Sequence, residues 1–178
     1  MIIIGIDPGL SGALALLKDG KLLNLWDMPV HKITTSTSSK NKIDHVGLAD
    51  IFDQLRLGRD PMGESILEPI HKVFIEQVGV RPGEGPAGAF TFGLGYGAIT
   101  QAVADLRAPY TFLSPQKWQR IAGLANGEDD NALALAKQTW PTALGPDRKP
   151  AFGLKKHVGR ADAALIALAG WKIERGAP

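Results

Sequence analysis

The first thirty residues alternate short apolar runs with glycine-containing turns. Apolar runs occupy residues 2–7, 11–17 and 22–30, and each has the length of a strand rather than a helix. The turn DPGLSG separates the first two runs, and KDGK, whose Asp-Gly pair is typical of tight hairpins, separates the next two. The pattern predicts three antiparallel strands in a meander.

A polar segment, a helical pattern and one more apolar run follow. Residues 31–42, HKITTSTSSKNK, are rich in Ser, Thr and Lys and predict a mobile loop. Residues 44–57 place apolar side chains every three to four positions, which predicts an amphipathic helix. The run KVFIEQV, residues 72–78, predicts a strand with one acid near its end.

The second half of the chain is predicted to be mainly helical. Residues 87–108 contain four glycines, each of which costs a helix about 1 kcal/mol relative to Ala. Gly93 and Gly97 lie one turn apart, so a helix here would present a small-residue face to another backbone. The remaining predicted elements are a strand in YTFLSP, helices in PQKWQRIAG, GEDDNALALAKQTWP and GRADAALIALAGWKIE, and a basic loop over 142–158.

The order of these elements indicates an α/β class, with a mixed sheet flanked by helices. A length of 178 residues with 44% hydrophobic side chains fits one domain, residues 1–178. The absence of cysteine excludes a disulfide framework and any cysteine-ligated metal, and it suits a reducing compartment. A net charge of +2 permits a nucleic-acid partner without requiring one. No signal peptide or membrane span is recognisable, so we expect a soluble, cytoplasmic protein without a membrane partner.

Three acids, Asp7, Glu76 and Asp162, lie in segments otherwise suited to the interior. A buried ionised carboxylate costs several kcal/mol unless it is paired or bound to a cation. Each acid could simply lie at the wet end of its element or cap a backbone N–H. Carboxyl ends of central strands converge on one crevice, however, where a divalent cation would relieve the mutual repulsion. Oxygen ligands favour Mg²⁺ or Mn²⁺, and two such ions about 4 Å apart can promote phosphodiester hydrolysis.

Four motifs, GIDPGLSGALAL, FIEQVG, FGLGYGAITQAVA and GRADAALIALAGW, resemble the successive motifs of RuvC-type Holliday junction resolvases. These enzymes belong to the RNase H-like superfamily, and the resemblance spans almost the whole chain. It implies a five-stranded mixed sheet whose first three strands are antiparallel. It also implies a homodimer that nicks a four-way DNA junction symmetrically with Mg²⁺, for which Mn²⁺ can substitute. Asp7, Glu76 and Asp162 match the catalytic, metal-binding positions of the family.

The sequence departs from the family pattern at two places. Many relatives carry a fourth ligand one helical turn before the final Asp, where this chain has Gly159. His157 could serve there as a ligand or a general acid or base if the helix begins at about Gly159; otherwise it would contact phosphate or lie on the surface. Relatives often carry an aromatic residue three positions after the strand Glu, where this chain has Gly79. Arg81 or Phe90 could replace that DNA contact.

Other residues are weaker candidates for DNA contacts or for dimerisation. Ser11 and Gly12 would shape a turn that phosphate can approach closely. The face at Gly93 and Gly97 is a candidate dimer contact. Basic residues could bind phosphates, although a solvated basic surface explains any one of them: Lys117, Arg120, Arg148, Lys149, Lys155 and Lys156.

A metal-dependent, junction-resolving endonuclease is the function that the sequence favours. A general branched-DNA or structured-RNA nuclease and a non-catalytic junction-binding protein stay open as alternatives, as does a branch-migration partner. A kinase or ATPase of the actin superfamily begins similarly but needs a second domain, for which 178 residues leave no room.

Overall fold

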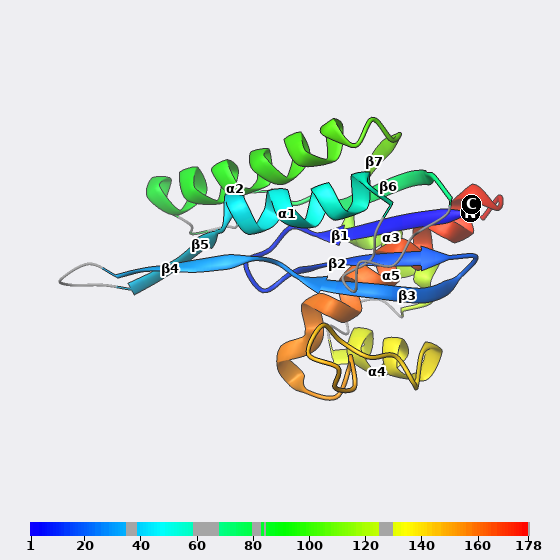
Figure 1. Cartoon of the computed structure of the whole chain (residues 1–178). Helices are drawn as coiled ribbons and strands as arrows, with labels where there is room; N and C mark the ends of the chain where they lie inside the picture. Colours follow the sequence, from blue (N-terminus) through cyan, green and yellow to red (C-terminus); the bar gives the residue numbers. More distant parts are fainter. Residues whose placement is uncertain (35–38, 59–67, 80–82, 84, 125–129, 178) are drawn as a thin grey trace.

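A five-stranded mixed sheet forms the centre of the molecule (Figure 1). The computed structural model describes residues 1–34, 39–58, 68–79, 83, 85–124 and 130–177. The strands lie in the order β3-β2-β1-β6-β7, which confirms the predicted α/β class and mixed sheet. Their bounds are Ile2–Asp7 (β1), Ala13–Lys18 (β2), Lys21–Asp27 (β3), Ile70–Glu76 (β6) and Tyr110–Leu113 (β7).

The two halves of the sheet differ in strand direction, as the chain order requires. β1, β2 and β3 form the predicted antiparallel meander, because tight turns join them. β6 and β7 each follow a helix and pair in parallel, β6 with β1 and β7 with β6. Strand β1 is therefore central, and five of its six residues are buried.

Helices cover both faces of the sheet. Helices α1 and α2 pack on one face through a buried cluster that includes Ile4, Ile6 and Phe52. Helix α5 crosses the other face, with α3 and α4 against it (Figure 1). The helix bounds are His45–Arg56 (α1), Pro86–Asp105 (α2), Pro115–Ala122 (α3), Asp130–Thr139 (α4) and Val158–Glu174 (α5).

Four of the predicted helices, α1, α2, α3 and α5, begin and end close to their sequence signals; the predicted start of α4 at residues 127–129 lies outside the described residues. The Asp44 carboxylate caps α1 by accepting from the Val46 N–H, and Pro lies in the first turn of α2 and α3. Gly123 ends α3 at φ 107°, a left-handed conformation that favours glycine. In the described part of the chain, no helix is both long and apolar enough to cross a bilayer.

The segment predicted as a loop over 31–42 is instead a β-hairpin, and that prediction was wrong. Strand β4 (Val30–Thr34) pairs antiparallel with β5 (Ser39–Ile43), and residues 35–38 lie outside the described residues. The polar composition concealed the strands, because both faces of this hairpin are exposed and the usual apolar alternation is missing. The hairpin projects from the body (Figure 1).

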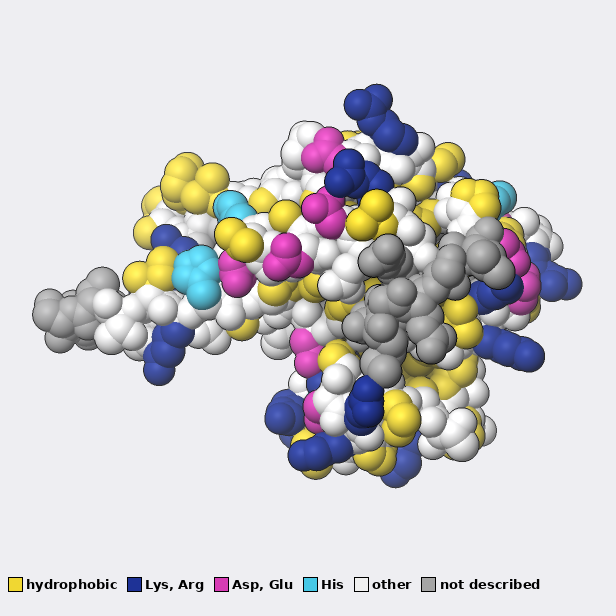
Figure 2. All heavy atoms as spheres, in the orientation of Figure 1, with side chains coloured by type: hydrophobic (Ala, Val, Ile, Leu, Met, Phe, Trp, Pro, Cys, Tyr) yellow, Lys and Arg dark blue, Asp and Glu magenta, His cyan; other side chains and the backbone are white. Residues whose placement is uncertain are grey.

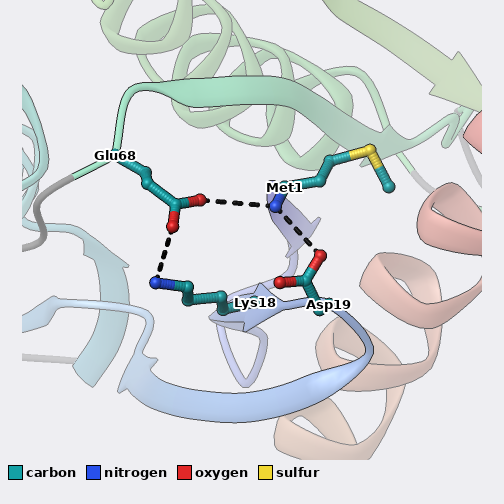
Figure 3. A network of polar contacts seen from close by, with 4 residues as sticks. All are labelled: Met1, Lys18, Asp19 and Glu68. Atoms are coloured by element: carbon teal, nitrogen blue, oxygen red, sulfur yellow. Dashed lines mark hydrogen bonds and ion pairs between the residues drawn. The ribbon is translucent and has the colours of Figure 1, made fainter.

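Charged groups hold the N-terminal end of β1, at the end of the sheet away from the β4–β5 hairpin (Figure 3). The ammonium group of Met1 lies 3.0 Å from Asp19 Oδ1 and 3.4 Å from Glu68 Oε2, and Lys18 Nζ lies 2.7 Å from Glu68 Oε1. Hydrogen bonds to these cations lower the pKa of both carboxyl groups. The contacts join β1, the β2–β3 turn and the approach to β6, far along the strands from Asp7.

Candidate active site

Asp7 is the last residue of β1 and begins the glycine-rich turn. Its Oδ1 atom accepts a hydrogen bond from the Gly9 N–H at 3.0 Å, which holds the half-buried carboxylate at the strand end. The turn closes through a 2.9 Å hydrogen bond from the Gly12 N–H to the Gly9 carbonyl. A Cβ at position 12 would collide with the Asp7 carbonyl oxygen, so this turn requires glycine there.

Glu76 ends the neighbouring parallel strand β6 at the same level. The register pairs Ile6 with Ile75, so Asp7 and Glu76 follow side by side at the carboxyl ends of β1 and β6. The Trp118 indole N–H donates to Glu76 Oε1 at 2.9 Å. Trp118 itself is buried under α5, so its packing fixes the position of the donor.

Helix α5 brings Asp162 to the same edge and face of the sheet. Its first turn packs Gly159 against the backbone of Ser11 and Gly12, and the next turn packs Ala163 against Gly5. Asp162 lies between these contacts and is half-buried, whereas every other residue from Gly159 to Gly170 is buried. Three chain segments far apart in sequence therefore place one acid each at this end of the sheet.

The oxygen donors at this edge suit Mg²⁺, which usually binds proteins through one or two carboxylates and completes its octahedron with water and substrate phosphate. Among residues with described placement, no group of three or more His, Asp or Glu side chains is gathered closely enough to hold a metal ion by itself. Asp7 and Glu76, on adjacent strand ends, are the pair best placed to begin such a site.

His157 is the N-cap residue of α5 and is buried. Helix α5 begins at Val158, close to the expected start, but His157 ends a 3₁₀ helix, Lys155–His157 (η1), and does not lie in a loop; its role in the site stays a prediction. Its Nδ1 atom accepts from the Leu154 N–H at 3.3 Å, which places the ring proton of the neutral form on Nε2. Burial lowers the pKa of His157, and the positive charges of Arg160 and Lys156 lower it further.

Gly159 occupies the position of the fourth family ligand for a steric reason. A Cβ at this position would collide with the Ser11 carbonyl oxygen and lie 2.8 Å from Gly12 Cα. The close approach of α5 to the turn after Asp7 therefore excludes any side chain, and with it any ligand, at residue 159. The sequence showed the glycine, but only the packing shows that it is required.

The structure adds two residues that sequence reasoning did not select as part of the site. Trp118 is buried, and its hydrogen bond to Glu76 joins two elements, so no local pattern indicates it. Arg160, two residues before Asp162, donates to both carboxylate oxygens of Asp27 and is buried. The sequence did contain a signal for Arg160, because it is an arginine within a mostly apolar helix and lies two residues before the candidate ligand Asp162.

The candidate DNA-binding residues lie on several separate elements. Ser11 is exposed in the turn after Asp7, and Phe90 on α2 is 68% exposed. Arg81 lies outside the described residues. The other candidates are all exposed, two on α3 and two just before α5: Lys117, Arg120, Lys155 and Lys156.

Known proteins resemble this chain in sequence and in fold. No protein-family model matches it. It is 30% identical over 153 residues to "Holliday junction resolvase MOC1, chloroplastic" of Chlamydomonas reinhardtii, a match that covers 80% of this chain and 17% of that protein. The chain thus spans about a sixth of the length of this curated relative.

Two solved structures from Thermus thermophilus share the architecture over nearly the whole chain. RuvC in complex with a Holliday junction substrate superposes with a TM-score of 0.58 at 15% identity, covering 99% of this chain and 96% of that one. A second RuvC structure superposes with a TM-score of 0.52 at 18% identity, covering 99% and 97%. The motif resemblance to RuvC-type resolvases is confirmed at the level of the fold, and the chain has the RNase H-like fold of RuvC.

Proposed function

We propose that this protein is a metal-dependent endonuclease that resolves four-way DNA junctions by paired, symmetric nicks. The observation that carries the proposal is the placement of Asp7 and Glu76 side by side at the ends of β1 and β6, with Asp162 of α5 at the same edge. The relative that matches in sequence is a Holliday junction resolvase, and one matching RuvC structure holds a Holliday junction substrate.

The three acids would hold Mg²⁺, with two ions in each active site, and Mn²⁺ as a substitute. When bound, the metal supplies activation of water and charge stabilisation at the scissile phosphodiester. Trp118 keeps one Glu76 oxygen in place by its N–H donation, so the carboxylate is oriented before the metal arrives. Buried His157 is neutral because its pKa is lowered, and its Nδ1 accepts from the Leu154 N–H, so it would act near the start of α5 as a hydrogen-bond donor through Nε2.

The DNA would approach this edge across basic and apolar side chains. Ser11 follows Asp7 in an exposed turn, and Lys155 and Lys156 precede α5. Lys117 and Arg120 extend the surface from α3. We assign Arg81 or Phe90 to the junction contact for which the resemblance expects an aromatic residue.

The protein would act as a homodimer through the outer face of α2. Leu94 is exposed there, and Gly93 and Gly97 have open space where a Cβ would lie. A second copy could pack closely on such a face, and two-fold symmetry matches a substrate with two equivalent strands. We also keep the expectation that residues 1–178 form one nuclease domain that acts in the cytoplasm.

Cleavage of an end-labelled four-way junction tests the proposal. The junction, a linear duplex, a Y-fork and a structured RNA would be compared in Mg²⁺, in Mn²⁺ and in EDTA. Asp7→Asn tests the site, and Asp50→Asn, an exposed acid on α1, is the matched control. We expect paired nicks on the junction alone, lost in EDTA and in Asp7→Asn but kept in Asp50→Asn. Unchanged nicking by Asp7→Asn would refute the assignment.

One observation favours a second candidate, a junction-binding protein without cleavage. Packing at Gly159 excludes the usual fourth ligand, and the described carboxylates do not form a complete metal group. Tight junction binding with no nicking in either metal would select this candidate. Equal cutting of every branched substrate would instead select a general branched-DNA nuclease.

A further inference from the structure

The β4–β5 hairpin leaves the molecule at the edge that carries the candidate active site. Asp7 lies opposite Ala13 in the sheet, and Ala13 lies opposite Asp27 at the end of β3. β4 begins three residues later at Val30. In Figure 1 the hairpin extends away from the body beyond this edge. We call residues 30–34 and 39–43 the arm.

Only the base of the arm packs against the body. Ile43 is buried and lies where a Cβ on Gly95 of α2 would meet it, at 2.8 Å. Every other residue of the two strands is exposed. An isolated two-stranded ribbon is marginally stable in water at best, so core formation does not account for the side chains along it.

Every charged side chain of the arm is basic. It contains Lys32, Lys40 and Lys42, and the sequence has no acid between Asp27 and Asp44, so the arm carries +3 with His31 neutral. Across the described residues, none of these three lysines forms an ion pair. Figure 2 shows dark blue side chains along the projecting arm. Such a surface attracts an anionic polymer.

The register places the lysines on both faces of the ribbon. Lys42 lies opposite His31 and Lys40 opposite Ile33, and opposed residues share a face, so these four side chains lie together. Lys32, opposite Asn41, lies on the other face. Five residues of strand extend about 17 Å, a length over which a DNA duplex presents about ten phosphate charges.

We propose that the arm lies in the major groove of a duplex flanking the cleavage site, with its lysines on the phosphates of both groove walls. The inference rests on the proposed function and extends it. The major groove of B-DNA admits a two-stranded ribbon, and phosphates on both sides suit lysines on both faces. The deep, narrow major groove of duplex RNA does not admit such a ribbon, so the arm selects DNA.

Lysines on exposed strands can also serve a different purpose, since they prevent strands of separate molecules from pairing. That explanation predicts self-association when the lysines are removed and no change in DNA affinity. Sedimentation velocity, run beside the binding measurements, separates the two explanations.

The test compares Lys40→Gln/Lys42→Gln with the matched control Lys21→Gln/Lys137→Gln. Lys21 and Lys137 are exposed on β3 and α4, away from the arm. Binding to a four-way junction, a DNA duplex and an RNA duplex would be measured in EDTA, from about 50 to about 300 mM salt. EDTA keeps binding separate from cleavage.

We expect the arm variant to bind junction and DNA duplex at least tenfold more weakly at about 0.1 M salt. Its slope of log affinity against log salt should fall by about two, because each substituted lysine no longer neutralises a phosphate. RNA binding and the control variant should not change. An arm variant with wild-type affinity and salt slope, whether monomeric or self-associated, would overturn the inference.

The outcomes also distinguish this inference from the proposed function. If the arm variant binds as the wild type does while both cleave junctions, the arm inference fails and the nuclease stands. If the arm variant loses affinity but the wild type never cleaves in Mg²⁺ or Mn²⁺, the nuclease fails and the arm stands. If the wild type binds no DNA, both fail.

Discussion

Arg160 in the first turn of α5 donates two hydrogen bonds, each 2.6 Å long, to the carboxylate of Asp27 at the end of β3. The Arg160 side chain is 7% exposed, and a second acid, Asp147, lies 3.5 Å from its Nη1 atom. The Asp27 carboxylate raises the pKa of the guanidinium, so Arg160 is charged. The pair fixes the start of α5 to the sheet two residues before Asp162, which makes Arg160 a positioning residue.

Removing the acidic partner should therefore destabilise the fold. We expect Asp27→Asn to lower the free energy of unfolding by about 2 kcal/mol, since the buried guanidinium loses a charged, bidentate acceptor whose own side chain is half exposed. Urea unfolding measures the change. Asp50→Asn should remain within about 0.5 kcal/mol of the wild type; equal stability of the two variants would contradict the prediction.

Gly159 on α5 is tightly packed and Gly93 on α2 faces open space, so replacing each with alanine should change stability in opposite directions. Gly159→Ala should destabilise by about 3 kcal/mol or prevent folding, because the new methyl group collides with the turn after Asp7. Gly93→Ala enters open space on a helix and should stabilise the monomer by up to about 1 kcal/mol. Thermal unfolding at low protein concentration checks both, and a tolerated Gly159→Ala would show that α5 can withdraw from the turn.

Trp118→Phe tests the indole donor on Glu76. The phenyl ring keeps most of the buried surface but removes the N–H that donates to Glu76 Oε1 at 2.9 Å. We expect a roughly tenfold lower cleavage rate, the size of one hydrogen bond to a charged group. The effect should shrink when Mn²⁺ replaces Mg²⁺ at high concentration, which a purely structural effect would not do. Trp140→Phe, which removes a 3.3 Å bond to the Gly20 carbonyl, is the control.

His157 should make stability depend on pH in a defined direction. Its pKa is lowered in the folded state, so the unfolded chain binds the proton first as pH falls. The stabilisation that neutral His157 gives the folded state is complete above pH 6.5, the ordinary histidine pKa. It is lost as pH falls below 6.5 toward the pKa of His157 in the folded state. Denaturation midpoints between about pH 7.5 and about pH 5 should therefore drop more for the wild type than for His157→Gln. Parallel curves would contradict the assignment.

The exposed face of α2 predicts a concentration-dependent dimer. Leu94→Asp places a charge on that face without touching the core, as Leu94 is 53% exposed. Sedimentation should show a dimer for the wild type and a monomer for this variant, with unchanged thermal stability of the monomer. Val46→Asp, at an apolar position on α1 that is 72% exposed, should leave the dimer intact.

The sequence alone determined the order of the helices and of the five strands of the central sheet, and it placed Asp7 and Glu76 at the ends of their strands. Short apolar runs, Asp-Gly turns and proline or glycine at helix ends are local signals, and they placed β1 and α5 within a few residues. The acids Asp7, Glu76 and Asp162 were selected because a carboxylate at the end of a buried segment is costly without a partner.

Tertiary structure decided what local patterns do not encode. The β4–β5 hairpin was concealed because strands exposed on both faces show no apolar alternation. The Trp118 donation to Glu76 and the Arg160–Asp27 pair join residues 42 and 133 positions apart, so only packing could reveal them. The requirement for glycine at position 159 likewise follows from the distance between α5 and a turn near the start of the chain. Contacts between distant segments depend on how the layers pack, and no short stretch of sequence contains that information.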